Sequence, residues 1–287
     1  MALVPLTYPI RSIIVRWSSA AFSAAGIACT VGVLAAVMAL HTGFAEMFEE
    51  SVPTDLVVYM RPGTNSEGES AITRENVEVI KKERLEIARL ADGSPAASAE
   101  MFLAVYLPKI DGSGDTNVPI RGVEPMSYEL AGPDFAFVEG RRPTPGANEL
   151  AIGRPVVNRI KNCRIDDTVT LNTTPFKVVG IFENSGPYRA EVWGDAERLM
   201  QALERPVFQR VIARCAKGSD IARLTEEIKN DKRIPLKFQT LRDYLDSQKV
   251  GLSMLLQFIA VALTSIMAVA AVIGATTMIF SIILLLN

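Results

Sequence analysis

The residue types that could support catalysis or metal binding are few and scattered along this sequence. His41 is the only histidine, and a metal site or a histidine-based triad would need more such residues or a cysteine cluster. Adjacent carboxylates occur at Glu49-Glu50 and Asp166-Asp167, but such pairs are common on solvated segments. We therefore expect no catalytic residue, no metal ligand and no cofactor in this chain.

Phosphate-binding chemistry is also weakly represented. No Gly-x-x-x-x-Gly-Lys-Ser/Thr motif occurs, so ATP hydrolysis is expected only in a partner subunit. Arg141 and Arg142 could bind an anionic ligand, although their position in a Pro/Gly-rich turn favours a solvated loop. Of the 30 basic residues, all but Arg11 and Arg16 lie in residues 41–249, as do all 32 acidic residues, which gives that segment a net charge of −4. A mildly acidic segment disfavours nucleic acid as a partner, because binding to phosphates needs basic side chains.

The cysteines leave two alternatives open. Cys163 and Cys215 could form a disulfide if they lie in an oxidising compartment. Two cysteines far apart in sequence do not establish such a bond, and free cysteines are often small buried residues. We therefore expect both to be buried thiols.

Two long apolar segments enclose the charged part of the chain. Residues 17–45 contain no Asp, Glu, Lys or Arg, and neither do residues 250–287. About 20 apolar helical residues cross a bilayer, so transmembrane helices are expected at residues 18–40 and 250–287, with an apparent truncation after the second. A cleaved signal peptide is the alternative at the first segment, but the segment exceeds the roughly 7–15 apolar residues of such a signal.

The first 17 residues are expected to form a cytoplasmic interfacial segment, with a disordered tail as the alternative. This segment carries Arg11, Arg16 and Trp17 and no acidic residue. Basic residues favour the cytoplasmic side of a membrane, and tryptophan favours its interface. The protein is therefore expected in the bacterial inner (plasma) membrane, surrounded by lipid, with residues 41–249 on the periplasmic or extracellular side.

Small residues recur at a spacing of four in both apolar segments, which permits close approach of helices in lipid. The candidates for helix packing are Ala28, Gly32, Ala36, Ala270 and Gly274. Chance spacing in alanine-rich helices is the alternative. Neither span contains a charged residue, so an ion pathway is not indicated.

The charged middle is expected to be an α+β domain built from an outer and an inserted part. Residues 41–110 and 205–249 each show a strand, a helix and a strand, and we expect these βαβ units to pair into one membrane-proximal subdomain. In the first unit Thr73 is a plausible N-cap for a helix over residues 74–90. Residues 241–249 are expected to continue as a helix into the second apolar segment.

The inserted part, residues 111–204, has the pattern of a β-rich subdomain. Residues 168–171 and 176–182 are rich in β-branched and aromatic residues and flank the turn residues 172–175. This pattern predicts a β-hairpin.

The order of short motifs in this middle part resembles the MacB/FtsX-type family of ABC-transporter permeases. The resemblance lies in Glu139–Pro143, Pro145–Arg154, Asp167–Val169, Phe176–Phe182 and Glu191–Asp195, preceded by a strand like Val118–Glu124. Its motif residues are Gly140, Arg141, Pro143, Gly146, Asn148, Glu149, Gly153, Gly180, Trp193 and Asp195.

The resemblance implies a non-enzymatic permease subunit with a MacB-like periplasmic domain. Members of the family work as dimers with a separate ABC-type ATPase, and use mechanotransmission for export or for lipoprotein and envelope handling. A second permease copy, or a polypeptide that supplies further helices, is the other expected partner. In the family a polar cytoplasmic loop follows the second helix, whereas residues 279–286 stay apolar, so transport by this polypeptide alone is in doubt. The alternative is a two-span periplasmic binding, sensor or assembly protein without transport activity.

Overall fold

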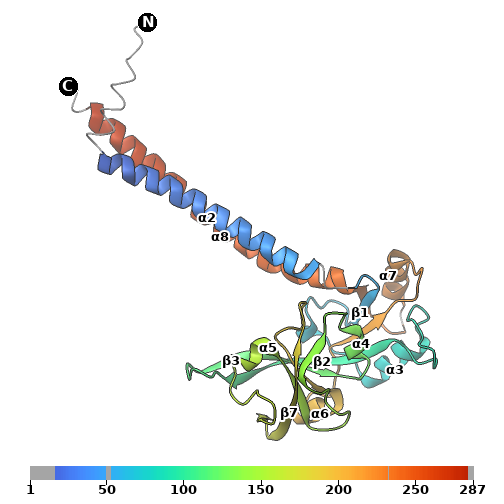
Figure 1. The fold of residues 1–287 in the computed structure, drawn as a ribbon. Helices are drawn as coiled ribbons and strands as arrows, with labels where there is room; N and C mark the ends of the chain where they lie inside the picture. Colours follow the sequence, from blue (N-terminus) through green and yellow to red (C-terminus); the bar gives the residue numbers. More distant parts are fainter. Residues whose placement is uncertain (1–16, 50–52, 232, 284–287) are drawn as a thin grey trace. The chain divides into compact units, whose positions relative to one another are not determined.

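The computed structural model describes residues 17–49, 53–231 and 233–283 (Figure 1). The chain divides into two units, one made of residues 1–45 and 249–287 and the other of residues 46–248. The predicted interfacial residues Arg11 and Arg16 lie outside the described residues.

The first unit contains most of two long helices, α2 (Trp17–Glu49) and α8 (Leu241–Ile283). They cover residues 18–40 and most of residues 250–287, where helices were expected. Large apolar side chains on both helices are exposed, among them Ile27, Val31, Met38, Phe258, Ile266 and Val272. Within the described ranges, no helix meets the combined length and hydropathy that identify a membrane span. The two predicted spans are therefore not confirmed.

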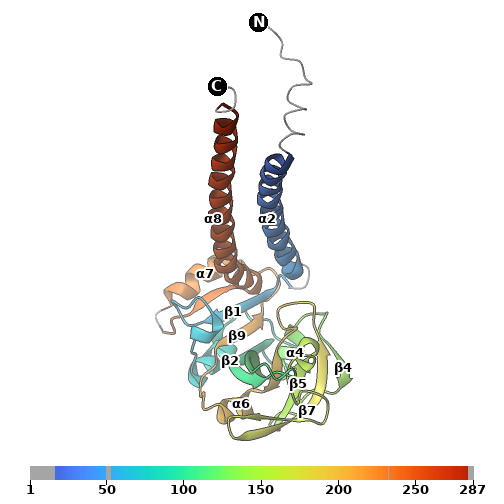
Figure 2. The same ribbon diagram turned by 90° about the vertical axis from the view of Figure 1, so that its left-hand side faces the viewer.

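The second unit begins with a four-stranded antiparallel arrangement in the order β10-β1-β9-β2. Its strands are β1 (Leu56–Met60), β2 (Ala97–Pro108), β9 (Arg210–Arg214) and β10 (Lys237–Thr240). The expected pairing of the two end segments is confirmed, and β9 lies between the two strands of the first segment (Figure 2). With helices α3 (Arg74–Glu83) and α7 (Ile221–Asn230), this is a split β-α-β arrangement.

Strand β1 is apolar throughout because both faces of this sheet are covered. Val57 and Tyr59 pack in one cluster with residues of α3 and α7, such as Ile80 and Ile228. Leu56, Val58 and Met60 point to the opposite face and join a second cluster with the first turns of α8. A strand that is buried on both faces loses the polar–apolar alternation of a half-exposed strand.

Strand β2 belongs to two parts of the sheet. Residues 97–100 pair with β9, whereas residues 101–108 pair with β3 (Asp115–Val123). From β3 the sheet continues in the order β8-β5-β7-β4, and β6 pairs with β7. These strands are β4 (Ala136–Gly140), β5 (Glu149–Gly153), β6 (Thr168–Leu171), β7 (Thr174–Glu183) and β8 (Val192–Asp195).

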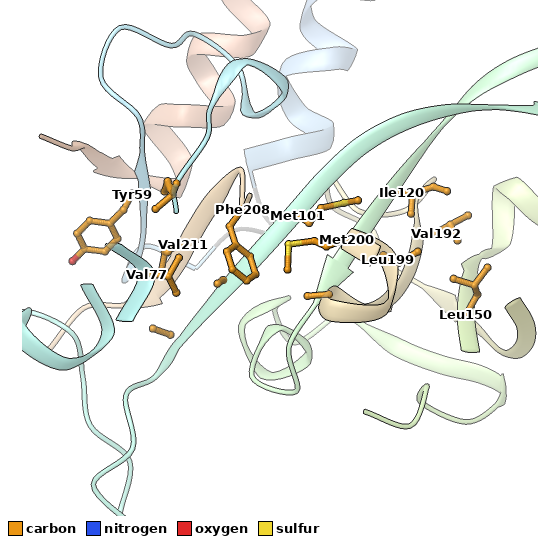
Figure 3. Packing of buried hydrophobic residues seen from close by; sticks show 14 of the residues in the cluster. Tyr59, Val77, Met101, Ile120, Leu150, Val192, Leu199, Met200, Phe208 and Val211 are labelled. Atoms are coloured by element: carbon orange, nitrogen blue, oxygen red, sulfur yellow. The ribbon is translucent and has the colours of Figure 1, made fainter. Parts of the chain in front are cut away.

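The remaining helices of the described residues are short and lie between these strands. They are η1 (Glu67–Glu69), α4 (Ser127–Leu130), α5 (Arg154–Val157) and α6 (Ala196–Ala202). One apolar core runs through both parts of the sheet, from Tyr59 and Val211 past Met101 to Leu199 and Leu150 (Figure 3). The inserted strands therefore share this core, and they have a second, smaller cluster around Phe182 and Trp193.

Two local predictions can be compared with the structure directly. The hairpin is confirmed, since β6 pairs with β7, and its turn is tighter than expected because Thr174 already belongs to β7. Thr73 caps α3 as predicted, accepting from the backbone N–H of Asn76. The helix ends at Glu83 rather than at residue 90, because Ile87 instead bridges to Cys215 beside β9 and becomes buried.

Two glycines permit close approach of the strands around β7. An added Cβ at Gly180 would overlap the carbonyl oxygen of Arg141, and one at Gly140 would overlap that of Val179. Gly140 also has a φ of +70°, which strongly favours glycine. Both positions therefore require a residue without a side chain.

We expect Gly180→Ala to lower the stability of the chain by about 3 kcal/mol, because the methyl group overlaps a backbone oxygen that cannot rotate away. Thermal unfolding of the purified chain, followed by circular dichroism, measures the effect. Gly68→Ala is the matched control, since an added Cβ there meets no atom within 4 Å. An equal, small shift of the midpoint in both variants would contradict the packing described here.

Candidate functional site

The motif residues between β4 and β5 form a clamped loop. Arg141 donates two hydrogen bonds to the Glu149 carboxylate at 2.7 and 2.6 Å, and the backbone N–H of Thr144 donates to the same group at 2.8 Å. The hydrogen bonds from Arg141 hold the pKa of Glu149 down at about 2. Glu149 is therefore ionised at neutral pH and fixes the loop against the start of β5.

A second carboxylate attaches the same loop to α6. Asp195 accepts from the backbone N–H of Gly146 at 2.9 Å and caps α6 by accepting from that of Arg198 at 3.0 Å. The guanidinium of Arg198 in turn donates to Asn148 at 2.7 Å. The loop and the helix are thus held together by Asp195 and Asn148.

The other motif residues also stabilise the fold rather than form a reactive site. Trp193 is fully buried in an aromatic cluster, and its indole N–H donates to Glu191 at 2.8 Å. Pro143 is buried in the loop, and Gly153 ends β5 as the N-cap of α5. Among the motif residues named from the sequence, Arg141 is exposed, and Arg142 beside it is exposed too and paired with Glu129. The motif therefore builds the inserted part of the sheet. Arg141 and Arg142 lie in an exposed loop, as expected, and binding of an anionic ligand there stays a prediction.

A cluster of buried charged side chains lies where the two parts of the sheet meet. Its members come from η1, β2, β3, the residue before β8, and β9. They are Glu67, Glu100, Arg121, Glu191 and Arg210, each at most 6% exposed. We call this group the buried charge cluster.

Arg121 makes the connection to the inserted strands. It donates two hydrogen bonds to Glu191, each at 2.7 Å, and its Nη1 donates to Glu67 at 2.6 Å and to Glu100 at 3.0 Å. Its guanidinium carbon lies 5.0 Å from the ring centre of Phe102 and 5.3 Å from that of Tyr188. Arg121 therefore holds three carboxylates and two rings at once.

Arg210 makes the connection to β9. It donates to Glu67 at 2.7 Å, to Glu100 at 2.7 Å and to the Tyr188 hydroxyl at 3.0 Å. Burial alone would raise the pKa of Glu67, but Arg121 and Arg210 lower it below its ordinary value. Likewise burial acts against the charge of Arg121, but Glu191 and Glu67 raise its pKa well above the ordinary value. Glu67 and Arg121 are therefore held in their charged forms.

The first turns of α8 attach to the same cluster. Tyr244 is 5% exposed, and its hydroxyl accepts from the backbone N–H of Glu67 at 3.2 Å. Leu241 and Tyr244 pack against Leu56, Val58 and Met60 of β1. The start of α8 is thus part of the domain core rather than a linker, and α8 continues as one helix to Ile283, in agreement with the predicted helical continuation.

The sequence interpretation missed the buried charge cluster because its members are far apart in the chain. Glu67 and Arg210 are separated by 143 residues. One signal was available, since Glu100 lies between Ala99 and Met101 within β2, and Arg121 follows Ile120 within β3. A charge in such a position is costly unless it is paired, so it indicates a partner elsewhere in the chain.

The structure also shows the exposure of the helix-packing candidates and of the cysteines. Ala28, Gly32, Ala36, Ala270 and Gly274 are all exposed, as is Trp17, so their predicted packing stays a prediction. Cys163 and Cys215 are free and buried, which confirms that they are not disulfide-bonded.

We expect Arg210→Met to destabilise the chain by about 3–5 kcal/mol, because Glu67 and Glu100 would lose a buried cation. The midpoint of thermal unfolding should fall by roughly 10 °C. Arg154→Met is the control, since Arg154 pairs with Glu139 and Glu183 in solvent, and we expect no measurable shift there. Similar midpoints for the two variants would show that the cluster does not hold the sheet together.

Comparison with known proteins identifies the family of this chain. Residues 20–231, more than half of the chain, match the family described as the MacB-like periplasmic core domain. The comparison with curated proteins found no match.

Two solved structures are similar at low identity. The periplasmic region of MacB from Actinobacillus actinomycetemcomitans has 10% identity and a TM-score of 0.49, covering 73% of this chain and 97% of that one. The extracellular domain of the ABC-type transporter YknZ from Gram-positive bacteria has 12% identity and a TM-score of 0.47, covering 65% of this chain and 98% of that one. Because these values are low, the assignment rests on the family match, which confirms the resemblance seen in the sequence. The chain belongs to the family of MacB-like periplasmic core domains, which are parts of ABC-transporter permeases.

Proposed function

We propose that this chain is a permease subunit of an ABC transporter of the mechanotransmission type. ATP hydrolysis by a separate ATPase would move its membrane helices, and the periplasmic domain would follow that motion to support export or lipoprotein and envelope handling. The observation that carries this proposal is α8, whose first turns are buried in the domain core and which continues unbroken to Ile283. The family membership supports the same function.

The membrane placement belongs to this proposal. We assign residues 18–40 and 250–287 to two spans, with the N-terminus cytoplasmic and the domain of residues 41–249 on the periplasmic side. Support comes from the absence of charged residues in both segments and from the exposed apolar side chains on α2 and α8. Apolar surface of this kind is stable only if lipid or other helices cover it.

The proposed route of motion starts at Tyr244. A shift of the first turns of α8 would act on the backbone of Glu67 through the Tyr244 hydroxyl and on β1 through apolar packing. Glu67 binds both Arg121 and Arg210, so the shift would reach β3 and β9 together. Because breaking a buried ion pair costs several kcal/mol, the two parts of the sheet would move as one body rather than slide.

The proposed partners are an ABC-type ATPase and a second permease copy, or a polypeptide that supplies further helices. The small residues at Gly32 and Gly274 are exposed on their helices and would allow close packing against such a partner. No nucleic acid is expected to bind.

Affinity purification of the tagged full chain from its own membranes in mild detergent, followed by mass spectrometry, tests this function. We expect an ABC-type ATPase and a second permease polypeptide to be recovered. Gly32→Leu should reduce recovery of the second permease polypeptide, because the larger side chain prevents close helix approach, whereas Val31→Leu is the matched control on the same helix. Recovery of neither partner, repeated after crosslinking, would contradict the proposal and favour a periplasmic binding, sensor or assembly protein.

A further inference from the structure

A small half-open hollow lies beside the loop between β4 and β5. Its volume is about 160 Å³, and its walls include Val123, Pro143, Pro145 and the side chain of Tyr128. Pro125, Arg142 and Asp195 complete the lining. The hollow therefore combines apolar walls with a few polar groups, as small-ligand sites do.

Tyr128 supplies a hydroxyl group to this hollow. Its side chain is 8% exposed, and its ring packs against Phe135, Phe137 and Trp193. The hydroxyl is not one of the buried side-chain atoms that lack a partner, so it can exchange hydrogen bonds with water or a ligand at the hollow. Burial raises the pKa of Tyr128, so the hydroxyl is neutral and can both donate and accept.

The two charged residues of the lining retain hydrogen-bonding capacity. Arg142 lies over the Tyr128 ring, with 5.0 Å from its guanidinium carbon to the ring centre, and one of its nitrogens donates to Glu129. The other guanidinium N–H groups remain available as donors. Asp195 accepts from two backbone N–H groups, and a carboxylate can accept about four hydrogen bonds.

The size and chemistry of the hollow select one class of ligand. An apolar cavity of about 150 Å³ holds one benzene ring, so this hollow is large enough for a single six-membered ring. A hydroxyl on that ring would pair with Tyr128 and Asp195, whereas an unsubstituted ring would leave the Tyr128 hydroxyl unpaired. We infer that this hollow is a binding site for one phenol ring. This site is independent of the transport function proposed above.

The fluorescence of Trp193 can be used to measure ligand binding at the hollow. The sequence has two tryptophans, so Trp17→Phe leaves Trp193 as the only one, and its ring centre lies 5.5 Å from that of Tyr128. The full chain carrying Trp17→Phe is titrated in detergent with p-cresol, toluene and N-acetyl-tyrosine amide. Tryptophan fluorescence, excited at its red edge to avoid the phenols, is recorded.

We expect saturable binding of p-cresol that is roughly threefold to tenfold tighter than that of toluene, the difference made by one hydrogen bond. Tyr128→Phe should weaken p-cresol binding to the level of toluene. Tyr106→Phe is the matched control, because it removes the hydroxyl of an exposed tyrosine elsewhere on the domain, and p-cresol binding should not change.

Titration with N-acetyl-tyrosine amide distinguishes two possible sources of the phenol ring. Binding of both p-cresol and N-acetyl-tyrosine amide would indicate that the site accepts a tyrosyl side chain, and binding of p-cresol alone would indicate a free phenolic compound. The inference is overturned if p-cresol gives no saturable change. It is also overturned if p-cresol and toluene bind equally, or if Tyr128→Phe leaves their difference intact.

Discussion

The pairing of two buried arginines with three buried carboxylates is the constraint on which this domain depends. Arg121 and Arg210 come from strands in different parts of the sheet, and Glu67 and Glu100 each bind both of them. Removing either arginine leaves three buried carboxylates with a single cation, which costs far more than an exposed ion pair gains. The apolar core would tolerate small sliding movements between the strands, but the charge cluster does not. It therefore makes the split β-α-β part and the inserted strands mechanically one body.

The first turns of α8 owe their position to the same constraint. Tyr244 accepts a hydrogen bond from the backbone of Glu67, whose carboxylate is fixed by both arginines. The motif residues that carry the family resemblance act elsewhere, since Glu149, Asp195 and Asn148 hold the loop between β4 and β5 against α6. The family motif therefore identifies the architecture of the inserted part. Of the residues proposed to transmit motion, Arg121 lies in a segment that carries the resemblance, whereas Glu67, Arg210 and Tyr244 lie outside these segments.

Local sequence signals predicted the elements whose causes are local. Thr73 caps α3, residues 168–182 form a hairpin, and α8 begins at Leu241, because capping and turn chemistry act over a few residues. The end of α3 was mispredicted because Ile87 gains more from burial beside Cys215 than from another helical turn. The position of β9 between β1 and β2, and the pairing of Glu67 with Arg210, depend on contacts between distant segments. Hydrophobic periodicity carries no information about such contacts.

The central claim is that α8 transmits motion to the domain, and a comparison of two variants at Gly251 tests it most directly. Gly251→Pro interrupts α8, at a cost of about 3 kcal/mol to the helix, whereas Gly251→Ala preserves it. Each variant carries Cys29→Ser, to remove the exposed thiol, and Ser113→Cys for a spin label on an exposed loop, since the other two cysteines are buried. The purified transporter complex is then measured in lipid with and without ATP. We predict that the distance between labels on two copies changes with ATP for Gly251→Ala but not for Gly251→Pro, although both complexes hydrolyse ATP. An identical ATP-dependent change in the two variants would contradict transmission through α8.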